Sequence, residues 1–170
     1  LSRATNRRTD EYGGSLENRG RFAREVIRSV RKAVGNDFPI LFRLSSDEFI
    51  KDGIDVEEAC RFACMFADEG IDLLHLNAGM PETGYYIVPT GSIADGWNAD
   101  RAETVRKALN GRIPVAVAGK IMNPELAESI LREGKADLIV MGRALIADPD
   151  LPRKAREGRA GEICPCLACN

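Results

Sequence analysis

Four short apolar runs, each followed by a stretch with helical spacing, constrain the fold of this chain more than any other feature. The runs span residues 39–44, 71–76, 113–118 and 138–141. Each is bounded by turn residues, as is typical of strands buried on both faces. Strands that alternate with helices form a parallel sheet with the helices outside it. Right-handed crossovers then give either an open, doubly wound sheet or a section of a β/α barrel.

Cap and stop residues delimit the predicted helices. Ser15 begins a helix that ends at Val34, before Gly35. Asp55, with Glu58 three residues later, resembles a capping box and begins a second helix. Three more helices are predicted from caps at Asp100, Asn123 and Asp148, the last two followed by proline. In the first helix Arg19 is among the polar positions, and the apolar residues that recur at helical spacing are Leu16, Phe22, Ala23, Val26, Ile27, Val30, Ala33 and Val34.

Length and charge exclude several classes of protein. The chain has 170 residues, 44% of them apolar, which is enough for one domain. A complete eight-stranded barrel needs about 250 residues, so a barrel would be present here as about half. The 24 basic and 26 acidic side chains argue against sequence-independent nucleic-acid binding. No apolar run approaches the roughly 20 residues of a membrane span. Because the first residue is not Met, we expect a piece of a longer protein.

The five cysteines fall into two groups. Cys60 and Cys64 lie in a helical pattern and are expected to pack as small apolar side chains. Cys164, Cys166 and Cys169 lie within the last seven residues, and thiolates separated by two residues can bind one metal ion or a cluster edge. An odd, clustered count favours a reduced, cytoplasmic protein over a disulfide framework. With only three thiols at hand, a tail without metal is the alternative.

Glycines follow the last two predicted strands. Gly119 comes after the third strand, and Gly142 with Arg143 comes after the fourth. Ligands of parallel sheets bind at the carboxyl ends of strands, where glycine lets backbone N–H groups approach an anion. Two neighbouring strands with such ends match the phosphate site of many barrels, and Arg143 could bind that phosphate with two donors. Alternatively, the glycines serve only tight turns and Arg143 pairs with a surface carboxylate.

Two polar residues interrupt the apolar runs. Arg43 lies inside a strand, where an unpaired buried charge costs several kcal/mol, so it needs either a ligand or a carboxylate from a neighbouring strand. His75 is the only histidine, and we expect a satisfied core or rim residue rather than a catalyst. The long connection over residues 77–99 is either a substrate rim or packs on its own apolar residues. Its aromatic residues include Tyr85, Tyr86 and Trp97.

Several motifs together resemble one family. Residues 6–19 (NRRTDEYGGSLENR) resemble the signature that follows strand 4 in the old yellow enzyme family of FMN-dependent reductases. The resemblance continues, in order, through residues 42–45 (FRLS), 117–121 (VAGKI) and 141–152 (MGRALIADPDLP). The ending, residues 166–170 (CLACN), resembles the subgroup with a 4Fe-4S cluster after the barrel, such as 2,4-dienoyl-CoA reductase and trimethylamine dehydrogenase.

The resemblance implies an α/β fold, a parallel half-barrel made of strands 5–8 of a TIM barrel. Residues 1–158 would be the C-terminal half of a flavin-binding barrel, and residues 159–170 the start of a truncated iron–sulfur segment. The implied activity is an FMN-dependent NAD(P)H oxidoreductase that reduces activated C=C bonds of small enone or enoyl substrates. The implied roles are flavin N1/O2 contact for Arg43, FMN phosphate binding for Gly119, Lys120, Gly142 and Arg143, and cluster ligation for Cys166 and Cys169.

The resemblance also implies parts that this chain lacks. Strands 1–4, the His-x-x-His or His-x-x-Asn substrate-binding pair and the tyrosine proton donor would precede Leu1, and two cluster cysteines would follow Asn170. We therefore assign no catalytic residue and expect the chain alone to have little or no turnover. A half-barrel exposes sheet edges and an apolar interior, so we expect self-association or pairing with an N-terminal half-barrel. The competing interpretations are a phosphate-binding barrel without flavin and a non-catalytic half-barrel module whose terminal thiols hold zinc.

Overall fold

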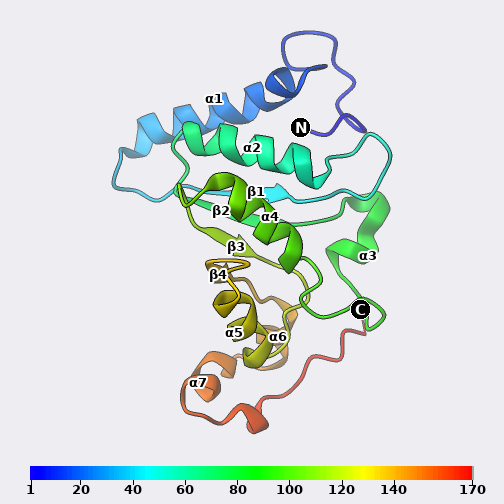
Figure 1. The fold of residues 1–170 in the computed structure, drawn as a ribbon, viewed down its shortest axis with the longest axis vertical. Coiled ribbons are helices and arrows are strands. Elements are labelled where there is room, and N and C mark those ends of the chain that lie inside the picture. Colours follow the sequence, from blue (N-terminus) through cyan, green and yellow to red (C-terminus); the bar gives the residue numbers. More distant parts are fainter. Residues whose placement is uncertain (170) are drawn as a thin grey trace.

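One parallel sheet organises the chain. The computed structural model describes residues 1–169. The strands are β1 (Leu41–Ser45), β2 (Leu73–Asn77), β3 (Val115–Val117) and β4 (Leu138–Ile139), and they lie side by side in chain order (Figure 1). All three strand pairs are parallel. The predicted parallel α/β sheet is therefore confirmed, with strand bounds shifted by at most two residues.

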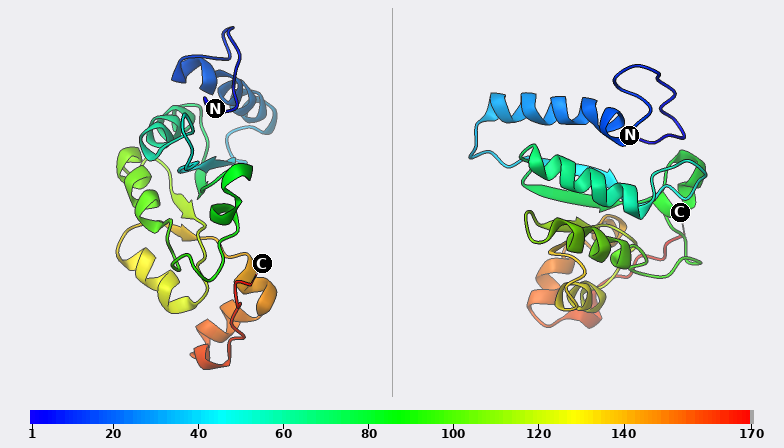
Figure 2. Two further views of the ribbon diagram at one scale, coloured as in Figure 1. Left: turned by 90° about the vertical axis from the view of Figure 1, so that its right-hand side faces the viewer. Right: turned by 45° about the horizontal axis from the view of Figure 1, so that its top comes forward.

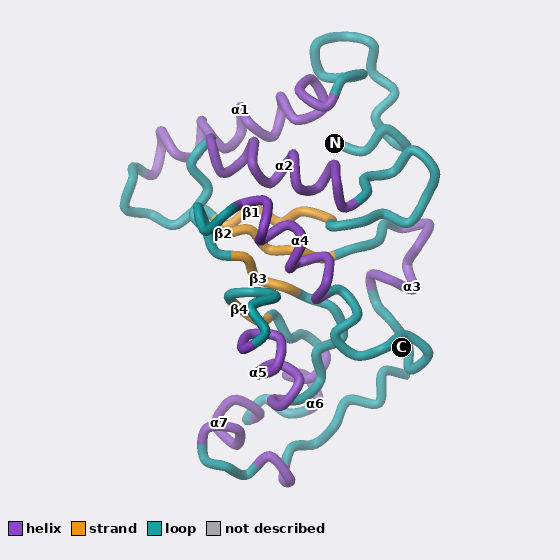
Figure 3. Tube along the Cα trace, viewed as in Figure 1, coloured by secondary structure: helices purple, strands orange, loops and turns teal. Residues whose placement is uncertain are grey.

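Helices pack on one side of this sheet. The long helices are α1 (Leu16–Val34), α2 (Val56–Asp68), α4 (Ala99–Leu109) and α5 (Pro124–Arg132). Helices α2, α4 and α5 cover one face of the sheet, and α1 packs on α2 (Figure 2). Figure 3 shows that long loops join these elements. The shorter helices are η1 (Pro81–Thr83), α3 (Gly84–Ile87), α6 (Arg143–Ala147), α7 (Leu151–Arg156) and η2 (Ala160–Glu162).

The hydrophobic core lies between the sheet and these helices. Alternate strand residues face the helices and are buried in one core cluster with Phe62 and Phe66 of α2; they include Leu44, Leu74, Leu76, Val115 and Val117. Burial of each such side chain stabilises the fold by about 1.5–3 kcal/mol. The intervening residues face the other way, and Leu41 remains 62% exposed and Leu138 44% exposed. The sheet is therefore the wall of a barrel with its inner face open.

Most of the predicted caps are confirmed. The side chains of Ser15 and Asp55 accept hydrogen bonds from first-turn N–H groups of α1 and α2, at 3.2 and 2.8 Å, and Asn123 does the same for α5 at 2.8 Å. The capping box at Asp55 forms only in part, because the Glu58 carboxylate turns to Arg19 at 2.6 Å. Arg19, expected among the polar positions, is buried in this ion pair.

Two predicted helix starts are wrong. Helix α4 begins at Ala99 with Asn98 as its N-cap, which places Asp100 in the first turn. Helix α7 begins at Leu151 with Asp150 as its N-cap, and the short helix α6 lies before it, directly after Gly142. Asp148 lies outside the helix: one carboxylate oxygen accepts from the Asp150 N–H at 3.1 Å, and the other accepts from Lys154 Nζ and the Cys164 N–H. The contacts with Lys154 and Cys164 also hold the pKa of Asp148 below its ordinary value, Lys154 having the larger effect.

One stripe of α1 is apolar and uncovered. Phe22 is 66% exposed, and Val26, Val30 and Val34 are each at least 40% exposed. The apolar residues of this helix thus form two stripes: Leu16 and Ile27 are buried, while the second stripe faces solvent. Within residues 1–169 no helix is both long and apolar enough to cross a membrane.

Candidate functional site

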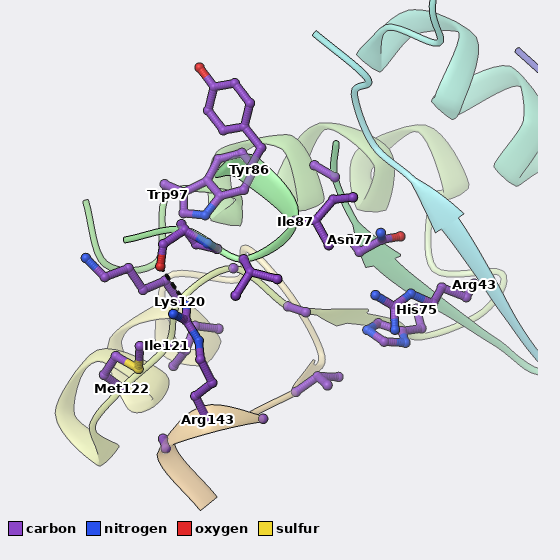
Figure 4. Close-up of a pocket in the computed structure, with 18 residues that line it drawn as sticks. Arg43, His75, Asn77, Tyr86, Ile87, Trp97, Lys120, Ile121, Met122 and Arg143 are labelled. Atoms are coloured by element: carbon purple, nitrogen blue, oxygen red, sulfur yellow. Dashed lines mark hydrogen bonds between the residues drawn. The ribbon is translucent and has the colours of Figure 1, made fainter. Parts of the chain in front are cut away.

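A cavity of about 260 Å³ lies at the carboxyl ends of the strands (Figure 4). This volume is below the roughly 300–1,000 Å³ of a complete small-molecule pocket, so the cavity accommodates part of such a ligand. The five residues predicted to bind cofactor all line it: Arg43, Gly119, Lys120, Gly142 and Arg143. The structure thus brings together residues that are up to 100 positions apart in sequence.

Backbone N–H groups are available at this cavity. No described residue accepts a hydrogen bond from the N–H of Gly119 or of Gly142. A Cβ atom placed on Gly142 would meet no heavy atom within 4 Å, so the space beside this residue is open. Gly119 is different, because a Cβ there would lie 2.7 Å from the Cβ of Asn98. Packing alone therefore requires glycine at position 119, whereas nothing in the described chain requires it at 142.

The cations at the cavity have different surroundings. The Lys120 side chain is only 7% exposed; its Nζ donates to the Ile93 carbonyl and lies 3.0 Å from the Asp95 carboxylate. Lys120 also adopts a left-handed φ of 56°, which is unusual for a residue with a side chain. The Arg143 guanidinium donates to the Pro89 carbonyl at 2.8 Å, the dashed line in Figure 4. Both side chains therefore fasten the β2–α4 loop over the cavity.

Arg43 and His75 form the other end of the site. They are register partners in β1 and β2, and Figure 4 shows their side chains side by side. Arg43 is exposed on the inner face and has no hydrogen bond or ion pair to another described residue. The expected burial is therefore wrong, and of the two alternatives for Arg43 the carboxylate from a neighbouring strand is not found among the described residues. The cavity lining within the described chain holds no Asp or Glu side chain.

His75 is a site residue that sequence reasoning missed. It lies at the rim of the cavity, one of the two expected places, but its Nε2 atom is buried and has no partner in the described part of the chain, so it is not satisfied as expected. Burial lowers the pKa of His75, and the charge of Arg43 lowers it further. Both effects favour the neutral imidazole. The alternation of its strand could have revealed this position, because His75 and Arg43 each precede the last strand residue by two.

Aromatic side chains from two loops meet beside the cavity. Tyr86 stacks on Phe49 with ring centroids 3.8 Å apart, and Trp97 lies 5.1 Å from Tyr86. Tyr86 and Trp97 line the cavity, whereas Tyr85 is exposed beside them. The buried Trp97 Nε1 has no acceptor among residues 1–169. Phe49, which was not predicted, holds a left-handed φ of 57°, an uncommon conformation for a bulky residue and one that clusters at functional sites.

The cysteine-bearing segment returns toward this end of the sheet. After η2 the chain runs back toward α3, as Figures 1 and 2 show. Cys164, Cys166 and Cys169 form no disulfide, and no three His, Cys, Asp or Glu side chains in the described chain gather as a metal site. Ala168 has a left-handed φ of 49° and turns the chain between Cys166 and Cys169. Cys60 and Cys64 pack against the core, as predicted.

Known proteins that resemble this chain in sequence or structure are named as oxidases and reductases. An NADH oxidase from Thermoanaerobacter brockii is 46% identical over the whole chain, and a cinnamate reductase from Clostridium sporogenes is 36% identical over 96% of it. The structure matches 2-naphthoyl-CoA reductase, solved with 2-naphthoyl-CoA, with a TM-score of 0.93 and 40% identity over the whole chain. This chain spans 26% of the length of each of these three proteins.

The parallel sheet, the helices on its outer face and the cavity at the strand ends define a section of a β/α-barrel enzyme. The sequence pattern of the NADH:flavin oxidoreductase / NADH oxidase family matches residues 1–162. The chain belongs to this family, and the resemblance noted in its motifs is confirmed.

Proposed function

We propose that this chain forms the phosphate-binding side of the flavin site in a longer FMN-dependent NAD(P)H oxidoreductase. The observation that carries the proposal is the cavity itself: N–H groups of Gly119 and Gly142 without acceptors, two arginines, and no acidic side chain in the described lining. Such a set of donors suits an anion. The share of the relatives' length that the chain spans supports a longer protein.

FMN fits the residues present. Open space beside Gly142 leaves room for phosphate oxygens, and the amides of Gly119, Lys120 and Gly142 would donate to them. Arg143 would add a positive charge at the same end of the cavity. When bound, FMN supplies hydride transfer between a nicotinamide and a C=C bond conjugated to a carbonyl. The chain's own contribution is to bind the cofactor and to orient it.

Arg43 supplies a second contact in this proposal. Its guanidinium lies on the open inner face and has no carboxylate partner in the described chain. It would face the N1/O2 edge of the flavin ring and stabilise negative charge there. The lowered pKa of His75 beside it favours the neutral imidazole, so within the described lining Arg43 is the cation at this end of the cavity.

The substrate class we propose is a planar, conjugated enone or enoyl compound. The cluster of Phe49, Tyr86 and Trp97 stands beside the cavity, and Arg101 lies over the Phe49 ring at 4.8 Å. Flat aromatic faces bind flat ligands by stacking. The names of the relatives point the same way, since cinnamate and 2-naphthoyl-CoA are both conjugated acyl compounds.

We also propose that Cys166 and Cys169 are two ligands of a 4Fe-4S cluster. The donor chemistry fits, because both are free thiols three residues apart on a segment that returns toward the cavity end of the sheet (Figure 1). A cluster, when bound, supplies one-electron transfer. Free thiols throughout the described chain suit the reducing cytoplasm, where we place the enzyme.

The remaining barrel would cover the exposed apolar surfaces. Exposed apolar side chains gather on the inner sheet face and on the stripe of α1 with Phe22 and Val30, rather than being scattered singly over the surface. In the full-length protein we expect the other barrel strands and helices to lie there. In the isolated chain the same surfaces favour self-association.

Flavin content of the full-length protein tests the proposal. We expect FMN in the purified wild type and a marked loss of FMN in Arg143→Ala, because the phosphate loses the guanidinium that we assign to it. Arg132→Ala, which removes an exposed arginine on α5, is the matched control and should retain flavin. A wild-type protein without flavin, or equal retention in both variants, would contradict the proposal.

A further inference from the structure

Asn98 lies behind the Gly119 turn and does not line the cavity. It is fully buried, and it is the N-cap residue of α4. Asparagine is favoured at N-caps because its side-chain oxygen accepts a hydrogen bond from a first-turn N–H. Here the side chain makes no such bond. The amide of Asn98 is therefore used for something other than starting the helix.

Two hydrogen bonds orient this amide. Ser46 Oγ, also fully buried, donates to Asn98 Oδ1 at 2.8 Å, and Asn98 Nδ2 donates to the Ala118 carbonyl at 3.0 Å. The Ala118 carbonyl can accept only from the Asn98 nitrogen, and the Ser46 hydroxyl satisfies the Asn98 oxygen. The Ser46 N–H in turn donates to the Asn77 carbonyl at 2.7 Å. A buried link thus joins the ends of β1, β2 and β3 at the cavity.

The consequence concerns the peptide bond between Ala118 and Gly119. The carbonyl of Ala118 and the N–H of Gly119 belong to one planar trans unit and point in opposite directions. By holding the carbonyl, Asn98 directs the Gly119 N–H away from itself, and that N–H has no acceptor among the described residues. Glycine is needed for this close approach, since a Cβ at 119 would lie 2.7 Å from the Asn98 Cβ.

We propose that Asn98 is a positioning residue that aims the Gly119 N–H at the phosphate of FMN. It acts through the Ala118–Gly119 peptide and does not touch the ligand. Donors held in place before binding lose little freedom when the anion arrives, which raises affinity for that anion. The inference rests on the proposed flavin site and adds a specificity to it: Asn98 strengthens the preference for FMN over riboflavin, the same ring system without the phosphate.

The test compares two flavins in the full-length, flavin-free protein. Fluorescence titrations would give dissociation constants for FMN and riboflavin in wild type, Asn98→Leu and Ser46→Ala. Losing the Ala118 bond in Asn98→Leu should weaken FMN binding about tenfold and leave riboflavin binding within about twofold. Ser46→Ala keeps the Asn98–Ala118 bond, and its FMN-to-riboflavin ratio should stay within about threefold of wild type.

Equal weakening of both flavins in Asn98→Leu, or no weakening, would overturn the role assigned to Asn98. If this variant does not fold, the wild type supplies the test by NMR. On titration with inorganic phosphate, the Gly119 backbone amide and the Asn98 side-chain amide should shift with one apparent Kd, and a shift of Gly119 alone would overturn the proposal. If the wild type binds neither flavin, the flavin site itself is refuted. If the wild type prefers FMN and Asn98→Leu has the same FMN-to-riboflavin ratio, only the role of Asn98 is refuted.

Discussion

The two cavity glycines lead to opposite expectations for a single added methyl group. At position 119 the new Cβ would lie 2.7 Å from the Asn98 Cβ, so the turn or the asparagine must move. Overpacking of this kind costs about 1–3 kcal/mol of unfolding free energy. At position 142 the Cβ meets no heavy atom within 4 Å and φ is −109°, outside the left-handed region. We expect Gly142→Ala to change the unfolding free energy by about 1 kcal/mol at most.

Thermal unfolding of the purified chain separates these cases. For a protein of this size 1 kcal/mol shifts Tm by about 2–4 °C, so a cost of about 2 kcal/mol in Gly119→Ala lowers Tm by about 4–8 °C. Gly142→Ala should stay within about 4 °C of wild type. In the full-length protein, however, Gly142→Ala should weaken FMN binding, because the methyl group occupies the space we assign to the phosphate. Equal loss of stability in both variants, or full FMN affinity in Gly142→Ala, would refute this reasoning.

Three further predictions follow from burial and exposure. The single histidine should titrate in NMR spectra below its ordinary pKa of about 6.5, and Arg43→Gln should raise the midpoint; an unchanged midpoint would exclude the coupling of Arg43 to His75. Because unfolded chains bind that proton more readily, the free energy of unfolding should fall as pH drops through about 6.5. Glu58→Gln leaves the buried Arg19 guanidinium without its carboxylate, so the free energy of unfolding, measured with denaturant, should fall by about 3–5 kcal/mol. A fall of less than about 1 kcal/mol would contradict a buried ion pair. The isolated chain should self-associate through the apolar stripe of α1, which sedimentation velocity measures. Phe22→Glu should reduce this association more than the control Ile146→Glu does. A wild-type monomer at high concentration would contradict association through the α1 stripe.

Local sequence signals predicted the fold well. The apolar runs located all four strands, and caps at Ser15, Asp55 and Asn123 located three helices, because each of these signals acts within a few residues. Predicted caps failed where a distant residue binds the same side chain. Glu58 pairs with Arg19 rather than completing a capping box, and such a choice depends on a residue far away in sequence.

The candidate site was predictable only in part. Glycines after β3 and β4 indicated the cavity, since strand ends meet at one edge of a parallel sheet. The burial expected for Arg43 was wrong because exposure depends on what covers the inner face. The sequence did not indicate a role for Asn98 in positioning the Gly119 N–H, because an asparagine before a helix is normally interpreted as an N-cap. Its contacts with Ser46 and Ala118 join three strand ends, and only the folded chain reveals them.

The central claim is that the strand-end cavity of this chain holds the phosphate of a flavin. A crystal structure of the FMN-loaded, full-length protein tests it most directly. The account predicts phosphate oxygens within hydrogen-bond distance of the Gly119 and Gly142 N–H groups, with the Arg143 guanidinium beside them. A phosphate bound elsewhere, with those two amides facing water or protein, would contradict it.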